Sequence, residues 1–201
     1  IEGSSTNLID RSFGDTGWTL NSSATRIANA LSSPDSTTNA TQLTTTASIS
    51  SGEFIFFPVV ASTTYTYSVF VKKISGDSNE IRIGSDQADD WGTTFNFRAE
   101  FNFSSGTFTL ENPSVDRTTV ETLPDGWFRI TMSGTTEVGA SGNTSFFLFN
   151  NDGSNAGVFG VYGFQVETND FATSFIETDG STVTRSADVA TVDITSAPWF
   201  N

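Results

Sequence analysis

The sequence contains no cysteine and no histidine. The lack of cysteine excludes a disulfide framework, a thiolate metal site and thiol redox chemistry, and it leaves the cellular compartment open. The lack of histidine removes the imidazole metal ligand and the base of the serine-hydrolase triad. Most hydrolase mechanisms are therefore excluded, and only carboxylates remain as candidate catalytic groups.

Basic residues are scarce, with 9 lysines and arginines against 23 aspartates and glutamates, so the formal net charge is −14. A chain this acidic is repelled by nucleic acid and by anionic membrane surfaces, and we expect neither as a partner. The acidity by itself indicates solubility more readily than a charge-specific role.

The carboxylates are also poorly placed for catalysis. Glycoside hydrolysis requires two carboxyl groups about 5 to 10 Å apart across one cleft, whereas the acids here are mostly spread singly through turns. Asp89 and Asp90 are adjacent, and side chains at adjacent strand positions point to opposite faces. We therefore expect no enzymatic activity.

Long hydrophobic runs are absent as well. No stretch reaches the roughly 18 consecutive apolar residues of a membrane-spanning helix, so we expect no membrane insertion. The first ten residues lack the basic and apolar zones of a signal peptide. The chain begins with Ile1 instead of methionine, and we interpret it as an excerpt of a longer polypeptide.

Aromatic and turn-forming residues dominate what is present. The chain has 201 residues with 19 phenylalanines, 4 tryptophans and 3 tyrosines, and most of the rest is threonine, serine, glycine and asparagine. This composition favours strands and turns over helices. The length suits one domain with a sizeable core.

Hydrophobic residues alternate with polar ones in three segments, as expected of strands covered on one side. The expected inward residues of segments 63–73, 79–84 and 93–103 are Tyr65, Tyr67, Val69, Val71, Ile81, Ile83, Phe95, Phe97, Ala99, Phe101 and Phe103. Segments 53–60 and 145–150 are apolar on both faces, which predicts strands covered twice or lying at the centre of a sandwich. Pro58 then marks an edge, a bulge or a strand end.

Turn residues separate these strands at short intervals, and no helical period lies between them. The pattern predicts an all-β fold, an antiparallel two-sheet β-sandwich of jelly-roll type. An immunoglobulin-like sandwich is the alternative, although roughly a dozen strand candidates is more than that fold uses.

Four segments follow one another along nearly the whole chain: SPDSTTNATQLT (33–44), TTYTYSVFVKK (63–73), DGWFRITMSGT (125–135) and VYGFQVETNDFATSFIETDGSTVTRSADVA (161–190). They resemble consecutive landmarks of a domain that recurs in phage fibre and spike proteins. The opening NLIDRSFGDTGW (7–18) is similar to that of secreted carbohydrate-binding jelly rolls.

This resemblance implies a domain organisation. Residues 1–167 would form the jelly-roll sandwich, residues 168–195 an extended carboxy-terminal strap packed on it, and residues 196–201 the start of a following module. We expect Phe171, Phe175 and Ile176 to pin the strap. The resemblance also implies a place on the virion surface, contacts with other modules of the same fibre, and a homotrimer.

Three functions remain open at this point. The first is a non-enzymatic carbohydrate-binding domain of a phage fibre or spike that attaches to a host cell-surface glycan. The second is a structural spacer, decoration or oligomerisation module of a virion. The third is a carbohydrate-binding module of a secreted glycanase.

The polar segment GSDQADDWG (84–92) carries the candidate ligand site. An aromatic ring displayed among polar side chains is the arrangement that sugars select, and we assign ligand binding to Trp91, Asp89, Asp90, Gln87 and Arg82. The alternative, which the sequence favours, is that Trp91 folds back as a plug over the sandwich. Trp18 and Trp127 follow glycines at strand starts, which indicates core plugs instead of sugar platforms.

A calcium ion is the one cofactor to consider, and we expect no other. Carbohydrate-binding jelly rolls similar to this chain often hold structural calcium near the amino-terminal turn, with a carboxylate directly after the phenylalanine and an aspartate on the final strand. Here Gly14 follows Phe13, and Gly163 and Phe164 stand in the final strand. Asp15 is a possible substitute ligand, and a simple turn in which Asp15 bonds its own backbone is the favoured alternative.

Overall fold

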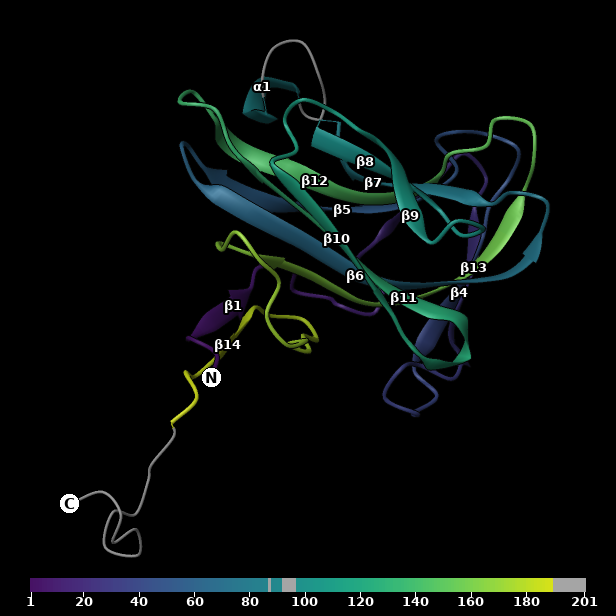
Figure 1. Ribbon diagram of the computed structural model, residues 1–201, viewed down its shortest axis with the longest axis horizontal. Helices are drawn as coiled ribbons and strands as arrows, with labels where there is room; N and C mark the ends of the chain where they lie inside the picture. Colours follow the sequence, from purple (N-terminus) through teal and green to yellow (C-terminus); the bar gives the residue numbers. More distant parts are fainter. Residues whose placement is uncertain (87, 92–96, 190–201) are drawn as a thin grey trace, which may run out of the picture.

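The computed structural model describes residues 1–86, 88–91 and 97–189. Two six-stranded antiparallel sheets pack face to face (Figure 1). The first sheet has the order β10 (Arg117–Thr122), β11 (Trp127–Thr135), β6 (Thr64–Gly76), β13 (Gly157–Glu167), β4 (Ala40–Thr44) and β3 (Thr25–Leu31). The second has the order β2 (Thr19–Asn21), β5 (Gly52–Val60), β12 (Ser141–Asn150), β7 (Glu80–Ser85), β8 (Phe97–Asn102) and β9 (Thr107–Glu111). The antiparallel jelly-roll sandwich predicted from the strand pattern is confirmed.

Little else is regular within the described residues. A two-stranded ribbon joins β1 (Ser5–Asn7) to β14 (Val183–Arg185), so the two ends of the described chain run side by side (Figure 1). One short helix, α1 (Ala88–Trp91), and one 3-10 turn, Pro124–Gly126, complete the elements. No helix within the described ranges is long and apolar enough to cross a membrane.

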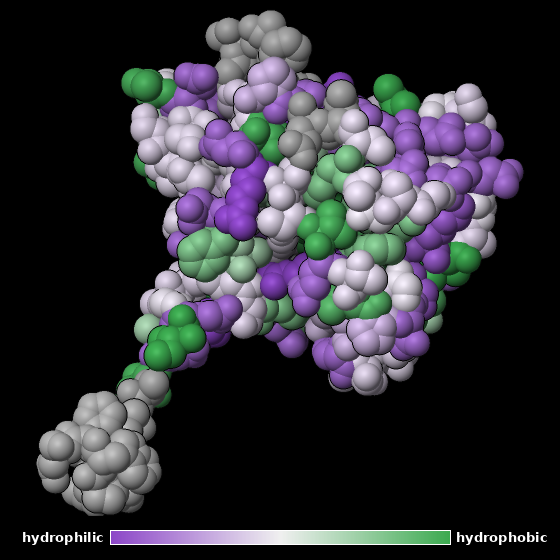
Figure 2. All heavy atoms as spheres, viewed as in Figure 1, coloured by the Kyte–Doolittle hydropathy of each residue, from purple (hydrophilic) through white to green (hydrophobic). Residues whose placement is uncertain are grey.

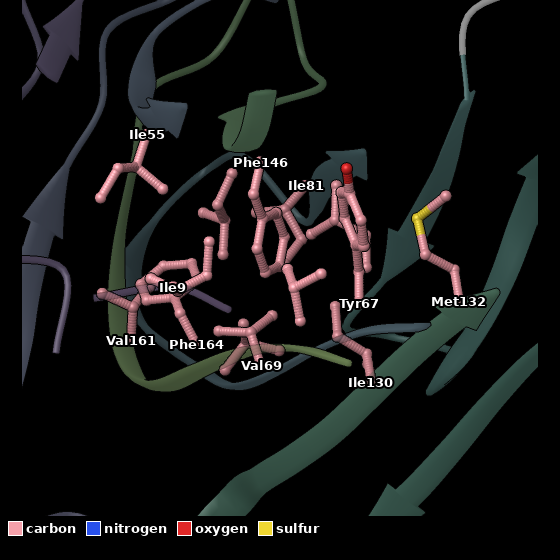
Figure 3. Packing of buried hydrophobic residues seen from close by; sticks show 14 of the residues in the cluster. Ile9, Ile55, Tyr67, Val69, Ile81, Ile130, Met132, Phe146, Val161 and Phe164 are labelled. Atoms are coloured by element: carbon pink, nitrogen blue, oxygen red, sulfur yellow. The ribbon is translucent and has the colours of Figure 1, made fainter. Parts of the chain in front are cut away.

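The core lies between the sheets and is built from the alternating residues. Figure 3 shows Val69 of the first sheet facing Ile81 and Phe146 of the second, within one cluster of buried residues. The predicted inward residues are buried at Tyr65, Tyr67, Val69, Val71, Ile81, Ile83, Phe97, Ala99 and Phe101, while Phe103 is partly buried and Phe95 lies outside the described residues. A period of two therefore located the inner face correctly.

The two segments that are apolar on both faces differ from each other. Residues 145–150 of β12 are buried throughout, as predicted, whereas β5 is not. Ile55 and Phe57 of β5 face the core, but Phe54 and Phe56 face outward, and Phe56 is 51% exposed. The expectation of double coverage is thus wrong for β5, because no described element lies over the outer face of Phe56. Pro58 pairs with β12 on one side, while β2 reaches only residues 52–54 on the other, so it lies on an edge as expected.

Residues 168–178 lie along the outer face of the first sheet. Phe175 packs with Phe13, Phe70 and Tyr162, and Ile176 is buried. Phe171 is 52% exposed, so its expected anchoring role is wrong. The boundaries at 167 and 195 stay a prediction, since residues 190–201 lie outside the described part.

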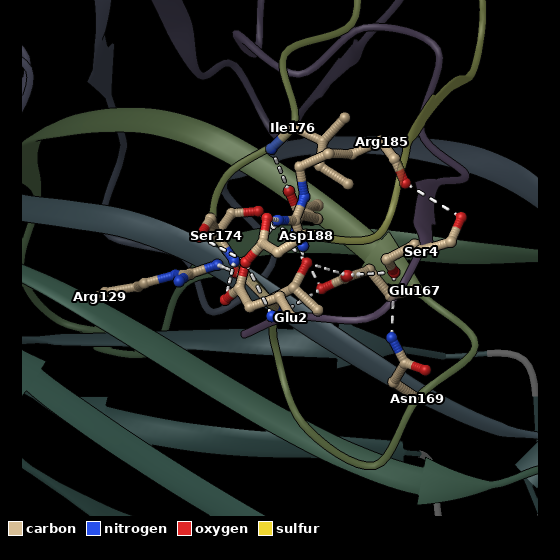
Figure 4. A network of polar contacts seen from close by, with 12 residues as sticks. Glu2, Ser4, Arg129, Glu167, Asn169, Ser174, Ile176, Arg185 and Asp188 are labelled. Atoms are coloured by element: carbon tan, nitrogen blue, oxygen red, sulfur yellow. Dashed lines mark hydrogen bonds and ion pairs between the residues drawn. The ribbon is translucent and has the colours of Figure 1, made fainter. Parts of the chain in front are cut away.

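Polar side chains hold the two ends of the chain against this face (Figure 4). Glu2 pairs with Arg185 at 2.6 Å and accepts hydrogen bonds from Ser174. Glu167 is fully buried, and it accepts hydrogen bonds from Ser5 and from Thr173. These contacts join the beginning and the end of the described chain through long-range pairs.

Trp18 and Trp127 are both buried, as their positions at strand starts predicted. Trp18 packs on Phe164 with ring centroids 4.1 Å apart and donates its indole N–H to the Arg11 carbonyl. Trp127 lies instead in a separate small cluster with Ala40 and Tyr162.

Candidate ligand-binding face

Trp91 is not displayed on the surface. It ends the short helix α1, is 1% exposed, and stacks on Phe97 with ring centroids 3.9 Å apart. The edges of Tyr65 and Tyr67 contact it, and its indole N–H donates to Thr144 Oγ1 at 3.0 Å. The expectation of an exposed ring is therefore wrong, and the alternative, a buried plug, is what the structure shows. Burial among aromatic rings removes the apolar surface of the indole from water, which stabilises the fold.

Of the other assigned residues, the structure describes the side chains of Asp90 and Arg82 only. Asp90 is buried, and its carbonyl accepts the Glu137 N–H at 2.9 Å. Gln87 and the side chain of Asp89 lie outside the described part of the structure. Arg82 lies on the outer face of β7. Ligand binding by these residues stays a prediction, but the exposed Trp91 ring on which it was based is absent.

Arg82 leads to a surface that sequence analysis missed. Its guanidinium lies 5.4 Å from the ring centroid of Phe147 and 5.6 Å from that of Phe149. Burial lowers the pKa of Arg82, while the negative charge of Asp86 opposes this shift. An arginine starts from a pKa far above neutrality, so the guanidinium keeps its charge.

Four phenylalanines lie on this side of the sheet, which we call the aromatic face: Phe54 and Phe56 of β5, and Phe147 and Phe149 of β12. Phe56 is 51% exposed and Phe54 is partly buried, whereas Phe147 and Phe149 are buried beneath their neighbours. They share one side of the second sheet because alternate residues of a strand point the same way. The antiparallel register places Phe54 opposite Phe147. The rings of Phe147 and Phe149 stack at 4.6 Å, and Phe54 contacts Phe56 edge-on at 5.5 Å.

A glycine on β5 leaves room for the ring of Phe149. Gly52 lies opposite Phe149 in the register. A Cβ at position 52 would lie 2.8 Å from Phe149 Cδ1 and 2.1 Å from the Leu148 carbonyl oxygen. Any other residue would therefore push β5 and the Phe149 ring apart.

The aromatic face surrounds a hollow of about 200 Å³. Besides the four rings, the lining residues are polar: Asn21, Ser50, Asp86 and Ser145. Apolar rings beside a few hydrogen-bonding groups are the usual composition of a small-molecule site. The arrangement suits a ligand with one apolar face and polar edges.

A signal for this surface was present in the sequence. Segments 53–60 and 145–150 are the two runs that are apolar on both faces, and the outward set of each contains two phenylalanines. We interpreted the second apolar face as covered. This is correct for Phe147 and Phe149, which are buried, and wrong for Phe56, because a strand pattern does not say how far its outer face is covered.

The turn around Asp15 does not offer a calcium cage. Glu53 lies beside this turn: its Oε1 would lie 2.6 Å from a Cβ at Gly14, and its Oε2 pairs with Arg26 at 3.2 Å. Arg26 already supplies positive charge to this carboxyl group. Among the described residues no group of three or more acids could hold a metal ion. Glu53 Oε1 is buried beside this turn without a hydrogen-bond partner, but one such oxygen is far fewer than the roughly six to eight that calcium takes. The described residues therefore fit calcium poorly, and calcium near Asp15 stays a prediction.

Comparisons with known proteins found similar solved structures at low sequence identity. No protein-family model and no curated protein sequence matches the chain. The xylan-binding CBM22-1 domain of Paenibacillus barcinonensis Xyn10C is 13% identical, with a TM-score of 0.47, covering 86% of this chain and 100% of that one. The CBM22-1–GH10 modules of Clostridium thermocellum Xyn10B are 12% identical, with a TM-score of 0.49, covering 88% of this chain and 30% of that one.

A phage protein is also among the similar structures. The enzymatically active domain of tailspike protein 4 of bacteriophage CBA120 is 9% identical, with a TM-score of 0.42, covering 80% of this chain and 21% of that one. At such identities and TM-scores the likeness supports no conclusion about this chain, and the ligands of these proteins are properties of those proteins.

Proposed function

We propose that this chain is a non-catalytic carbohydrate-binding module and that it binds glycan on the aromatic face. The observation that carries the proposal is the exposed ring of Phe56 and the partly buried ring of Phe54, which lie beside a hollow edged by Asn21, Ser50, Asp86 and Ser145. The buried rings of Phe147 and Phe149 form the floor of this hollow. Sugars present C–H faces that stack on aromatic rings and hydroxyl groups that bond to polar side chains.

The same hollow supports a binding role more than a catalytic one. Asp86 is the one carboxylate among the described residues that line it. Glycoside hydrolysis uses a pair of carboxyl groups across the bond that is cleaved. A single carboxylate beside rings can accept hydrogen bonds from sugar hydroxyls but lacks the second group that this reaction needs.

The finer assignment follows the sequence landmarks. We place the module in a phage fibre or spike on the virion surface, where it attaches to a host cell-surface glycan, next to other modules of the fibre and within a homotrimer. The second candidate is a carbohydrate-binding module of a secreted glycanase, which the same aromatic face would serve equally. A spacer, decoration or oligomerisation module without a ligand is the third.

A glycan array with the isolated chain tests the proposal. The array carries bacterial lipopolysaccharide and capsule fragments together with xylan and mixed-linkage glucan oligosaccharides, followed by calorimetry on each hit. We expect retention of at least one glycan, and Phe56→Ala should weaken that binding at least tenfold.

The matched control is Ile27→Ala, which removes an equally exposed apolar side chain from β3 of the other sheet. It should bind as the unaltered chain does. Bacterial surface glycans among the hits favour the fibre, and plant polysaccharides favour the glycanase. An empty array, or unchanged binding by Phe56→Ala, would refute binding on the aromatic face.

A further inference from the structure

A second groove lies on the opposite side of the sandwich, on the outer face of the first sheet. Its volume is about 190 Å³, and β10, β11 and residues 170–172 form its walls. Pockets for drug-sized ligands span ~300–1,000 Å³, so this groove has room for about one sugar ring. On the face seen in Figure 2, hydrophilic and hydrophobic residues are interspersed, as they are in this groove.

The floor of the groove is a ladder of polar side chains on two paired strands. The register places Arg117 opposite Ser133, Thr119 opposite Thr131, and Glu121 opposite Arg129. The two threonine hydroxyls are hydrogen-bonded to each other. All six side chains line the groove, because the residues alternate and one set of each strand faces outward.

The wall formed by residues 170–172 is held to the sheet by hydrogen bonds from the residues on either side of it. Thr66 Oγ1 donates to the Asn169 carbonyl at 2.7 Å, and Arg129 Nη2 donates to the Thr173 carbonyl at 2.6 Å. The Arg129 guanidinium also lies 5.2 Å from the ring centroid of Phe70. The groove is therefore shaped before any ligand arrives, which lowers the entropic cost of binding.

The charges in the groove balance. Arg117 and Arg129 contribute two positive charges, and Glu121 and Asp170 contribute two negative charges. A neutral group with hydroxyls, which both donate and accept hydrogen bonds, matches such a set without leaving a buried charge uncompensated. An anion or a cation would meet as much repulsion as attraction.

An aromatic ring stands beside these polar groups. Phe171 lines the groove and is 52% exposed. Phe175, four residues further along the chain, packs instead against a hydrophobic cluster. About half of the Phe171 side chain is therefore open to solvent at the groove. A ring next to convergent donors and acceptors offers a stacking surface for the C–H face of a sugar.

We propose that this groove is a second saccharide-binding site, for one unit of a neutral glycan, and that the module is bivalent. The site uses Arg117, Glu121, Arg129 and Asp170 for the hydroxyls and Phe171 for the ring face. The aromatic face lies on the other sheet and shares none of these residues. Two sites facing opposite ways let one module bridge neighbouring glycan chains and gain avidity from their linkage.

The test is a titration followed in amide ¹H–¹⁵N spectra of the chain. The probes are the methyl pyranosides of glucose, galactose and mannose, together with glucuronate and glucosamine as charged counterparts. We expect at least one neutral pyranoside to shift the amides of Thr119, Thr131 and Phe171, and to do so at lower concentration than either charged sugar.

Two variants separate the sites. Phe171→Ala and Arg117→Gln change exposed side chains and should each weaken the groove shifts at least tenfold while leaving the rest of the spectrum in place. Phe56→Ala should leave the groove shifts intact. Shifts at Phe54 and Phe56 report the aromatic face separately, so failure at either face is seen independently of the other.

The inference is overturned if no probe shifts the groove amides, or if glucuronate or glucosamine shifts them more strongly than every neutral sugar. It is also overturned if the shifts persist in both groove variants, or if they disappear in Phe56→Ala, since the two sites would then not be independent.

Discussion

The indole of Trp91 lies almost parallel to the ring of Phe97, with centroids 3.9 Å apart and an interplanar angle of 12°. This contact joins the short helix α1 to the first residue of β8, and both side chains are fully buried. A residue in the most polar loop of the sequence thus belongs to the hydrophobic core.

Replacing Trp91 by alanine should therefore destabilise the chain severely. We expect a loss of ~3–5 kcal/mol in the free energy of unfolding, the usual cost of removing a buried aromatic side chain. Urea titration followed by far-UV circular dichroism measures it. Val138→Ala, at an 83% exposed position, is the control and should change stability by no more than ~0.5 kcal/mol. A similarly small loss for Trp91→Ala would contradict the plug.

Phe56 and Phe57 are neighbours on β5 that face opposite sides of the second sheet. Phe57 is buried in the core against Tyr65 and Tyr67, whereas Phe56 is half exposed. We expect Phe57→Ala to cost ~3–5 kcal/mol and Phe56→Ala less than ~1 kcal/mol in the free energy of unfolding. Equal losses in parallel denaturation curves would show that the outer face is covered after all.

Asn7 ties three segments of the chain together. Its side-chain amide donates to the carbonyls of Phe164 and Ile176, and its side-chain oxygen accepts from the amides of Ile9 and Val166. Because Asn7 is fully buried, Asn7→Ala leaves four polar groups unsatisfied. We expect it to lower the free energy of unfolding by ~2–4 kcal/mol.

The measurement for Asn7 is thermal unfolding combined with limited proteolysis of residues 168–189. Asn143→Ala is the matched control because Asn143 is exposed on β12. Faster cleavage in Asn7→Ala than in the control is expected. Equal melting temperatures for the two variants would show that the four hydrogen bonds add no net stability.

Glu53 should make stability depend on pH. Burial raises the pKa of Glu53 to about 8 from an ordinary value of 4.5, although Arg26 lowers it. A carboxyl group that holds its proton more tightly in the folded state stabilises the fold below its unfolded pKa, and this contribution is lost as the pH rises through the folded pKa. We expect stability to fall with a slope of up to about 1.4 kcal/mol for each pH unit between about 5 and 8.

Urea unfolding of the unaltered chain and of Glu53→Gln at several pH values isolates this group. The glutamine has no proton to lose, so the difference between the two curves carries the pH dependence of Glu53. Two parallel curves across this range would show that the Glu53 carboxyl does not titrate there.

Calcium removal should leave the fold unchanged. The turn near Asp15 faces Glu53 and Arg26, and the guanidinium already neutralises that carboxyl group when it ionises. We expect the melting temperature to stay within about one degree on addition of EDTA and again on addition of excess calcium, since a tightly bound ion would shift it by linkage. A drop of several degrees with EDTA that calcium reverses would establish a metal site.

The sequence by itself determined the strand content and the inner face of most strands. Tyr65, Tyr67, Val69 and Val71 were placed in the core from a period of two alone, and the structure agrees. This worked because alternation is a local property of the extended backbone, so each strand with one polar face carries its own orientation. The burial of Trp18 and Trp127 was also predicted from a local feature, a glycine directly before each tryptophan at the start of a strand.

Only the tertiary structure decided which apolar faces stay open and where the loop aromatic goes. Phe56 is exposed because no described element covers that part of β5, and Trp91 is buried because Phe97, Tyr65 and Tyr67 leave a space that it fills. The candidate hollow depends on Phe54 and Phe147 lying opposite each other on β5 and β12, two paired strands that are far apart in the sequence. Such contacts depend on how sheets pair and pack, and the free energy of burial depends on those neighbours, which a single strand pattern does not contain.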